Sequence, residues 1–272
     1  MRDDARRAAL TLLELVVVLA ILAALTGVAV KSLEPIADQA RYEATKKTLG
    51  HIRDAIVTLP PVRRGDGSLA VQGFVSDMGR LPRSLNELLV KPVNEADPTK
   101  NLFEFARGVD YGVQRIASST DGLPCGWRGP YLQATTFTTG WGTDFIENTS
   151  NPDPQDASRF VLDAIHVVQP GTANVLAVPS EFDPTVSTTD NTLLDSAYVD
   201  VSVMFGTPPM GAVSLYIPDA NSGTLKRLTE DGTSTTTLKV FLDVPVGVRL
   251  IEESSTYKYV DVTRGMPPVH FN

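Results

Sequence analysis

Residues 10–30 read LTLLELVVVLAILAALTGVAV, an almost unbroken apolar run that one carboxylate, Glu14, interrupts near its start. At about 1.5 Å per residue, a helix of this length is long enough to cross a bilayer. An ionisable side chain in such a run is costly unless a partner neutralises it, so Glu14 is a candidate functional residue. The run predicts an N-terminal membrane helix.

Three explanations compete for this start. A secretory signal peptide normally has a shorter apolar run, carries no acid and ends at a small-residue cleavage site, and no such site stands out beyond the run. A plain membrane anchor accounts for the length and for the basic flank, Arg2, Arg6 and Arg7, but leaves Glu14 unexplained. The third explanation is a processed assembly subunit, and the order of residues at the start of the run favours it.

Residues 9–14, ALTLLE, match position by position the processing motif of type IV pilin and pseudopilin precursors, and the chain resembles that family. The departures are Ala9, where the family usually has glycine, and Leu10, where it usually has phenylalanine. The resemblance implies that a prepilin peptidase cuts between Ala9 and Leu10 and that the new amine of Leu10 is methylated. It also implies that this amine pairs with Glu14 of a neighbouring subunit during assembly.

Charge and composition indicate where the rest of the chain lies. The arginines before the apolar run favour a cytoplasmic tip, which predicts a single-pass protein of the bacterial inner membrane with its remaining domains in the periplasm. The formal net charge is -8, and no cluster of Lys and Arg follows the leader, which excludes nucleic acid as a partner. The chain has one cysteine, Cys125, so it cannot close an internal disulfide.

Two further segments resemble the major pseudopilin of type II secretion. In the first, residues 77–92, Ser84 and Glu87 have the spacing of a capping box at the start of a short helix. The second comprises residues 127–132, WRGPYL, and residues 140–145, GWGTDF. We interpret its aromatic residues as core and turn residues that lead into a small antiparallel sheet.

Major pseudopilins also hold calcium in the loop that follows the Trp-Gly segment. The corresponding loop here, residues 148–156, is rich in oxygen atoms but lacks the family's aspartate pattern. We interpret it as a solvated polar loop and expect no cofactor, with Asp153 and Asp156 as the candidate ligands if a cation binds.

The C-terminal part exceeds the length of a typical major pseudopilin. Short β-rich runs at residues 198–205, 211–217, 236–242, 246–251 and 257–262 predict an antiparallel sandwich. The sequence therefore predicts an α+β fold in which a long N-terminal transmembrane and filament helix packs on a small antiparallel sheet and a β-rich domain follows. The expected divisions are a leader at 1–9, a long helix at 10–59 with its membrane span at 10–30, a pilin-like head at 60–165, a linker at 166–194 and the β-rich domain at 195–272.

No phosphate-binding loop, nucleophile elbow or zinc-ligand spacing occurs in the sequence, and we expect no enzymatic activity. The predicted function is that of a structural subunit of a type II secretion or type IV pilus-like filament. Its expected partners are the prepilin peptidase, copies of itself, other pilin-like subunits and the inner-membrane assembly platform. Two alternatives remain open: a minor pilin that initiates or caps the filament, and an adhesive or carbohydrate-binding module displayed on a pilin-like stalk.

Overall fold

We describe the protein from a computed structural model of residues 1–272. The structure describes residues 2–57, 73–92, 113–115, 122–127, 130–133, 137–168, 171, 175–178, 192–209, 211–220, 224–230 and 236–271. All statements below concern these residues, and side chains are described for fewer of them, those of residues 2–13, 28–32 and 175–178 being among those left out.

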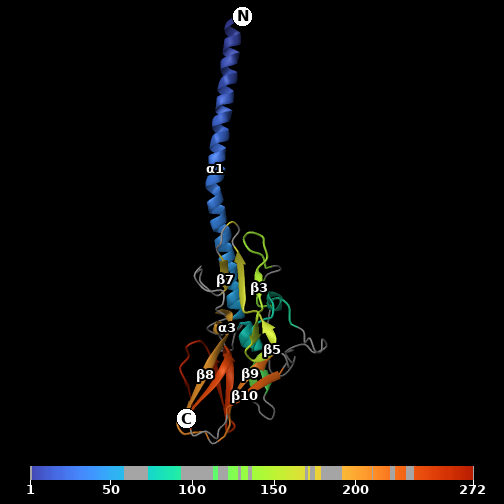
Figure 1. The fold of residues 1–272 in the computed structure, drawn as a ribbon, viewed down its shortest axis with the longest axis vertical. Coiled ribbons are helices and arrows are strands. Elements are labelled where there is room, and N and C mark those ends of the chain that lie inside the picture. Colours follow the sequence, from blue (N-terminus) through green and yellow to red (C-terminus); the bar gives the residue numbers. More distant parts are fainter. Residues whose placement is uncertain are drawn as a thin grey trace.

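Helix α1 (Arg2–Ile56) projects as a rod from the rest of the molecule, with the N-terminus at its free end (Figure 1). Its C-terminal part is anchored by Thr45, Leu49, Ile52 and Ile56, which are all buried. These residues recur every three or four positions and therefore lie on one face of the helix. Pro35 stands inside the helix without ending it.

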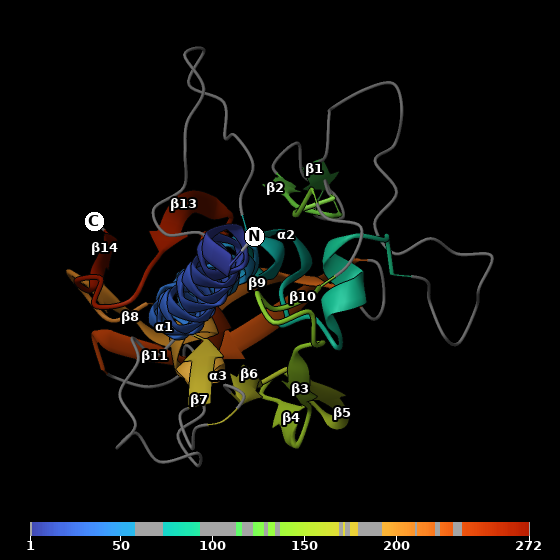
Figure 2. The same cartoon turned by 90° about the horizontal axis from the view of Figure 1, so that it is seen from above.

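The middle of the chain forms short elements around the anchored end of α1 (Figures 1 and 2). They are α2 (Phe74–Met78), the 3-10 helix η1 (Leu85–Leu88), β1 (Val113–Arg115), β2 (Gly122–Pro124), β3 (Ile146–Asn148), β4 (Asn151–Asp153), β5 (Asp156–Val161), β6 (Ala164–Val168) and β7 (Val175–Val178). The strands form two antiparallel hairpins, β1-β2 and β4-β5, and one antiparallel sheet of order β3-β6-β7. We call this part, residues 73–178, the head.

The C-terminal part comprises α3 (Thr192–Ala197), β8 (Tyr198–Phe205), β9 (Val213–Asp219), β10 (Thr224–Glu230), β11 (Leu238–Pro245), β12 (Gly247–Glu253), β13 (Thr256–Val262) and β14 (Val269–Phe271). Two sheets of order β10-β9-β12-β13 and β11-β8-β14 pack face to face as a sandwich. Every strand pair is antiparallel except β14 and β8, which are parallel. The five β-rich runs of the sequence are thus confirmed as strands.

Alternation along the strands builds the core of the sandwich. On β8, Val201, Val203 and Phe205 point inward, and on β9 Val213, Leu215 and Ile217 do the same. Successive side chains of a strand point to opposite faces, so each sheet contributes one apolar face to the interior.

A second core is shared by the head and the C-terminal part. It combines Leu49, Ile52 and Ile56 of α1 with head residues such as Phe74 and with C-terminal residues such as Tyr198. The sandwich is therefore joined to the head by continuous apolar packing, which implies that the two share their stability.

Two glycines allow the head and the sandwich to approach closely. A Cβ on Gly79, which ends α2 at φ 72°, would lie 1.9 Å from the carbonyl oxygen of Pro218 on β9. A Cβ on Gly247, at φ 120°, would lie 2.1 Å from Oγ of Ser76. Both positions need a residue without a Cβ, for backbone conformation and for space.

Another glycine fixes the helix to the head. A Cβ on Gly140 would lie 2.4 Å from the carbonyl oxygen of Arg41, and the Gly140 N–H donates to Oγ1 of Thr45 over 2.8 Å. Thr45 Oγ1 in turn donates to the same Arg41 carbonyl. The Gly-Trp-Gly turn at residues 140–142 thus lies directly on the backbone of α1.

The structure contradicts the predicted membrane span. Among the described residues, no helix has an apolar stretch long enough to cross a membrane. Within the predicted span at 10–30, side chains are described for residues 14–27, and at about 1.5 Å per residue these cover roughly 20 Å of the ~30 Å hydrocarbon core. The predicted single-pass inner-membrane location, and the filament built on that span, are corrected on this finding.

The predicted fold class is also wrong. We expected a transmembrane filament helix packed along one small sheet, with a β domain following it. The described residues instead form fourteen strands, divided among five sheets, and α1 contacts the head through its C-terminal part, from Arg41 and Tyr42 to Ile56. The physical reason is that apolar side chains of the sandwich and of the head complete one shared core, whereas the N-terminal stretch of α1 has no sheet beneath it.

The capping-box prediction fails for a local reason. Ser84 is the N-cap of η1, but its side chain makes no capping hydrogen bond. Glu87 accepts from the N–H of Arg83 over 3.0 Å and from the guanidinium of Arg80. The carboxylate of Glu147 takes the N–H of Leu85 instead, over 3.3 Å. An arginine close in space thus outcompetes the local cap.

Candidate functional site

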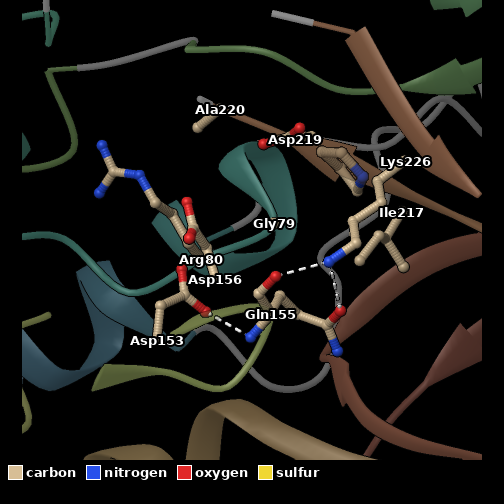
Figure 3. A pocket seen from close by; sticks show the side chains of 10 residues that line it. Gly79, Arg80, Asp153, Gln155, Asp156, Ile217, Asp219, Ala220 and Lys226 are labelled. Carbon is tan, nitrogen blue, oxygen red and sulfur yellow. Dashed lines mark hydrogen bonds between the residues drawn. The ribbon is translucent and has the colours of Figure 1, made fainter. Parts of the chain in front are cut away.

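A cavity of about 290 Å³ opens between the head and the sandwich (Figure 3). The end of α2, the β4-β5 hairpin and strands β9 and β10 surround it. Its lining consists of Gly79, Arg80, Asp153, Gln155, Asp156, Ile217, Pro218, Asp219, Ala220 and Lys226. We call it the seam cavity, because residues from two parts of the chain that are far apart in sequence form its wall.

Arg80 supplies a buried charge at the wall of the seam cavity. Its side chain is 3% exposed and pairs with Glu87, with Nη1 and Oε2 2.7 Å apart. Nη2 donates to Oε1 over 3.2 Å, which makes the pair bidentate. Nη1 also donates to the carbonyl of Leu81, and the guanidinium lies 5.5 Å from the centre of the Phe74 ring. Glu87 therefore neutralises Arg80 before any ligand could.

Asp153 links the hairpin to the start of β8. Its Oδ1 accepts from the N–H of Gln155 over 2.8 Å and from the hydroxyl of Tyr198 over 3.1 Å. The same hydroxyl accepts from the N–H of Leu81 over 3.4 Å. Burial raises the pKa of Asp153, although these hydrogen bonds and Arg80 oppose the shift. Burial, and then the charge of Asp153, raises the pKa of Tyr198 well above its ordinary value.

Asp156 has the opposite electrostatic character. Its Oδ1 accepts from Oγ of Ser158 over 2.6 Å, and its Oδ2 lies 3.3 Å from Nε of Arg159. The hydrogen bond from Ser158 is the main cause that lowers the pKa of Asp156. The pKa values of these two carboxylates, three positions apart, therefore shift in opposite directions, because burial is the main influence on Asp153 and the hydrogen bond from Ser158 is the main influence on Asp156.

Lys226 closes the cavity from the side of the sandwich. Its Nζ donates to the carbonyl oxygen of Gln155 over 2.5 Å and to Oε1 of the same residue over 3.3 Å (Figure 3). Gln155 Nε2 donates onward to the carbonyl of Asp243 on β11 over 2.5 Å. Among the lining residues, Gln155 therefore connects Asp153 to Lys226, whereas Arg80 and Asp156 bond to residues outside the lining.

The chemistry available at the seam cavity is limited. Its described lining has no serine, cysteine or histidine, and its ionisable side chains are Arg80, Lys226 and three aspartates. Elsewhere in the described residues, no group of three or more His, Cys, Asp or Glu side chains is arranged to hold a metal ion.

The sequence-predicted calcium candidates, Asp153 and Asp156, do lie together in this cavity. Their carboxylates are already engaged by Tyr198 and Ser158, and the expectation that this loop holds no cofactor stays a prediction. Lys226 adds a positive charge on the same wall, which opposes a cation.

The other predicted site residues lie far from the cavity, on α1. Ala9 and Leu10 belong to the helix, but their side chains are outside the described part. Glu14 is exposed at the start of an apolar stretch that is also exposed. Exposure in this stretch ranges from 49% for Val17 and Val18 to 61% for Leu15, and consecutive residues share it, so apolar side chains surround the helix.

Sequence reasoning missed Arg80, Gln155 and Lys226. Arg80 lies within the pseudopilin-like segment at 77–92, but a single arginine in a sequence does not indicate that it is buried or which residue it pairs with. Lys226 stands on β10, a strand absent from the predicted set, and its contact with Gln155 spans 71 positions.

Comparisons with protein-family models, with curated proteins and with solved structures give no match for this chain.

Proposed function

We propose that this protein is a non-enzymatic, pilin-like structural subunit that joins neighbouring subunits through the N-terminal half of α1. The exposed apolar stretch of the helix, residues 15–25, carries this proposal. Soluble proteins rarely expose a continuous apolar surface of this kind unless another molecule covers it. Equivalent helices of other copies, or of related pilin-like subunits, are the cover that we propose.

The anchored end of the helix supports this role. Thr45, Leu49 and Ile52 are buried against the head, and the turn at Gly140 lies on the helix backbone. A rod that is firmly held at one end and apolar at the other can transmit force between a head and its neighbours.

Processing belongs to the same proposal. Cleavage by a prepilin peptidase between Ala9 and Leu10 gives a new amine one helical turn before Glu14. In an assembly of parallel helices, the amine of one subunit neutralises Glu14 of the next. This pairing offsets the cost of covering a carboxylate with apolar side chains and fixes the axial register.

Mass spectrometry of the protein from its native host tests the processing step. A mature N-terminus at Leu10, with a methyl group on its amine, is expected. An N-terminus at Met1, or one beyond Val30, would overturn the processing part of the proposal.

The pairing role of Glu14 is tested by substitution. In Glu14→Gln the exposed apolar stretch is unchanged but the charge is lost, so we expect fewer chemically cross-linked multimers of the processed protein. Glu34→Gln is the matched control, since Glu34 is an exposed glutamate of the same helix outside the apolar stretch. Equal loss in both variants, or in neither, would remove the specific role of Glu14.

A further inference from the structure

A second unexplained apolar surface lies on the sandwich. Leu238, Val240 and Leu242 of β11 and Met204 of β8 are 44%, 37%, 63% and 37% exposed. They share one face of the sheet, because alternate residues of β11 point outward and Leu238 pairs directly with Met204. We call these four residues the outer β11 face. Single exposed apolar residues are ordinary on protein surfaces, but four that adjoin indicate a contact.

This face ends in carboxylates. Beyond Leu242, a bulge in β11 turns Asp243 to φ 51°, and its N–H donates to Oδ1 of Asp200 on β8 over 3.1 Å. A hollow of about 360 Å³ lies there, and both aspartates line it together with Arg264. The surface therefore passes from a row of apolar side chains to a polar hollow. The charged groups named here are two carboxylates and one guanidinium, so negative charge is in excess among them.

Helix α1 carries a stripe of exposed residues in the matching order, with apolar side chains first and a positive charge at the end. Leu33, Ile36, Ala40, Ala44 and Lys47 are exposed and recur every three or four positions. At about 100° per residue, this stripe lies nearly opposite the buried face formed by Thr45, Leu49 and Ile52. The helix can therefore contact its own head and another molecule at the same time. Leu33 and Ile36 are 60% and 65% exposed, so a large apolar area is available.

The dimensions of the two surfaces agree. Leu238 to Leu242 spans about 13 Å along a strand, and Asp243 lies about 17 Å from Leu238. Along the helix, Leu33 to Ala40 spans about 10 Å, and Lys47 lies about 21 Å from Leu33. A helix laid along the strand thus places its apolar residues on the apolar row and brings the ammonium group of Lys47 to the carboxylates.

We propose that the outer β11 face binds the Leu33-to-Lys47 stripe of α1 from a second copy of this chain. This inference rests on the proposed function, in which α1 joins subunits, and it names the surface that receives the helix. A second copy is the occupant because the chain itself supplies both halves, apolar against apolar and a lysine against two aspartates. The contact joins two different surfaces, so each copy retains one free surface of each kind.

Disulfide trapping tests the contact in the full-length chain. Copies with Leu242→Cys are mixed with copies with Ala40→Cys, both in a Cys125→Ala background that removes the one native thiol. We expect a disulfide-linked heterodimer as the main oxidised product. Asp38→Cys is the matched control, because residue 38 is exposed on the opposite side of the same helical turn. Equal trapping by Ala40→Cys and Asp38→Cys would overturn the proposal.

Charge provides a second test that leaves the apolar row intact. Lys47→Glu is expected to abolish the heterodimer, whereas Lys46→Glu, which points about 100° away from the stripe, is expected to retain it. Loss in both variants would show only a general effect of charge and would contradict the assigned contact.

A third cysteine pair separates this inference from the proposed function. Copies with Val18→Cys report helix-to-helix contact within the apolar stretch. Trapping through residue 18 without trapping between residues 40 and 242 would overturn the outer β11 face and leave the proposed function standing. Absence of both products would overturn the two together.

Discussion

Arg249 Nη1 of β12 lies 3.0 Å from the carbonyl oxygen of Ser76 in α2, although 173 positions separate the two residues. The Arg249 side chain is fully buried and donates also to the carbonyls of Val75, Pro245, Val246 and Val248. A guanidinium presents five N–H groups, and here backbone carbonyls accept them. This side chain therefore fastens the sandwich to the backbone of α2.

Substitution of Arg249 is expected to weaken the whole fold. In Arg249→Met the apolar stem is retained, but buried carbonyls of the head and the sandwich lose their donor, which costs about 3 kcal/mol or more. Urea unfolding measures this loss as a lower midpoint. Arg264→Met, on the exposed surface, is the control and should change stability by no more than about 0.5 kcal/mol. Similar midpoints for the two variants would contradict the fastening role.

The close approach at Gly79 predicts an unequal pair of glycine substitutions. Gly79 and Gly142 both have a positive φ, 72° and 77°, but only Gly79 has an atom in the way of a Cβ. Gly142→Ala should cost about 1 kcal/mol for the backbone conformation alone. Gly79→Ala should cost about 3 kcal/mol, because overpacking against Pro218 is added to the same conformational penalty. Thermal unfolding of the two variants measures the difference, and equal melting temperatures would refute the contact.

The attachment of α1 to the head depends on Thr45. In Thr45→Val the N–H of Gly140 loses its acceptor, and we expect a loss of about 1–3 kcal/mol together with faster amide exchange at Gly140. Thr48→Val is the matched control, since Thr48 Oγ1 bonds only to the carbonyl of Ala44 in the same helix and is exposed. The control should stay within about 0.5 kcal/mol of the natural protein. Unchanged exchange at Gly140 in Thr45→Val would show that the turn is held by other contacts.

The raised pKa of Asp153 predicts that the stability of the fold depends on pH with a sign that is unusual for an aspartate. Because burial raises its pKa in the folded state, the folded protein binds this proton more tightly than the unfolded chain does. The charged form therefore destabilises the fold above the folded pKa, and that cost disappears as the pH falls through it. Asp153→Asn keeps an oxygen acceptor for Gln155 and Tyr198, so at neutral pH it should raise the melting temperature by about 2–4 °C.

Asp156→Asn is the counterpart of that variant. The pKa of Asp156 is lowered in the folded state, so its charge stabilises the fold above the unfolded pKa, and this contribution is lost as the pH falls through the folded pKa. The substitution should therefore lower the melting temperature slightly at neutral pH and have no effect in acid. Melting curves between pH 3 and pH 7 check both signs, and a parallel response of the two variants would contradict the electrostatic difference between them.

Much of the local structure was predictable, because period-2 alternation is visible in the sequence. The runs at 198–205 and 236–242 alternate between apolar and polar residues over much of their length, and they form β8 and most of β11. The predicted capping box failed because Glu87 has a stronger partner in Arg80, seven positions away, and sequence spacing alone does not rank the two.

The candidate sites divide in the same way. Glu14 was identified from the sequence because a lone charge in an apolar run is visible without any structure. The seam cavity and the outer β11 face were not identified from the sequence. Their residues come together only through contacts between distant segments, such as that of Lys226 with Gln155. Alternation indicates that Leu238, Val240 and Leu242 share a face, but not whether another layer covers that face.

The sequence by itself determined five strands of the sandwich, β8, β9, β11, β12 and β13, and the carboxylate within the apolar run, since both depend on neighbouring residues and on fixed periods. Only the tertiary structure decided that the head and the sandwich share one core, that Arg249 fastens them and that α1 is buried at one end alone. The reason is physical: burial, ion pairing and the absence of space for a Cβ depend on atoms that lie far away along the chain, and these meet only when the whole chain has folded.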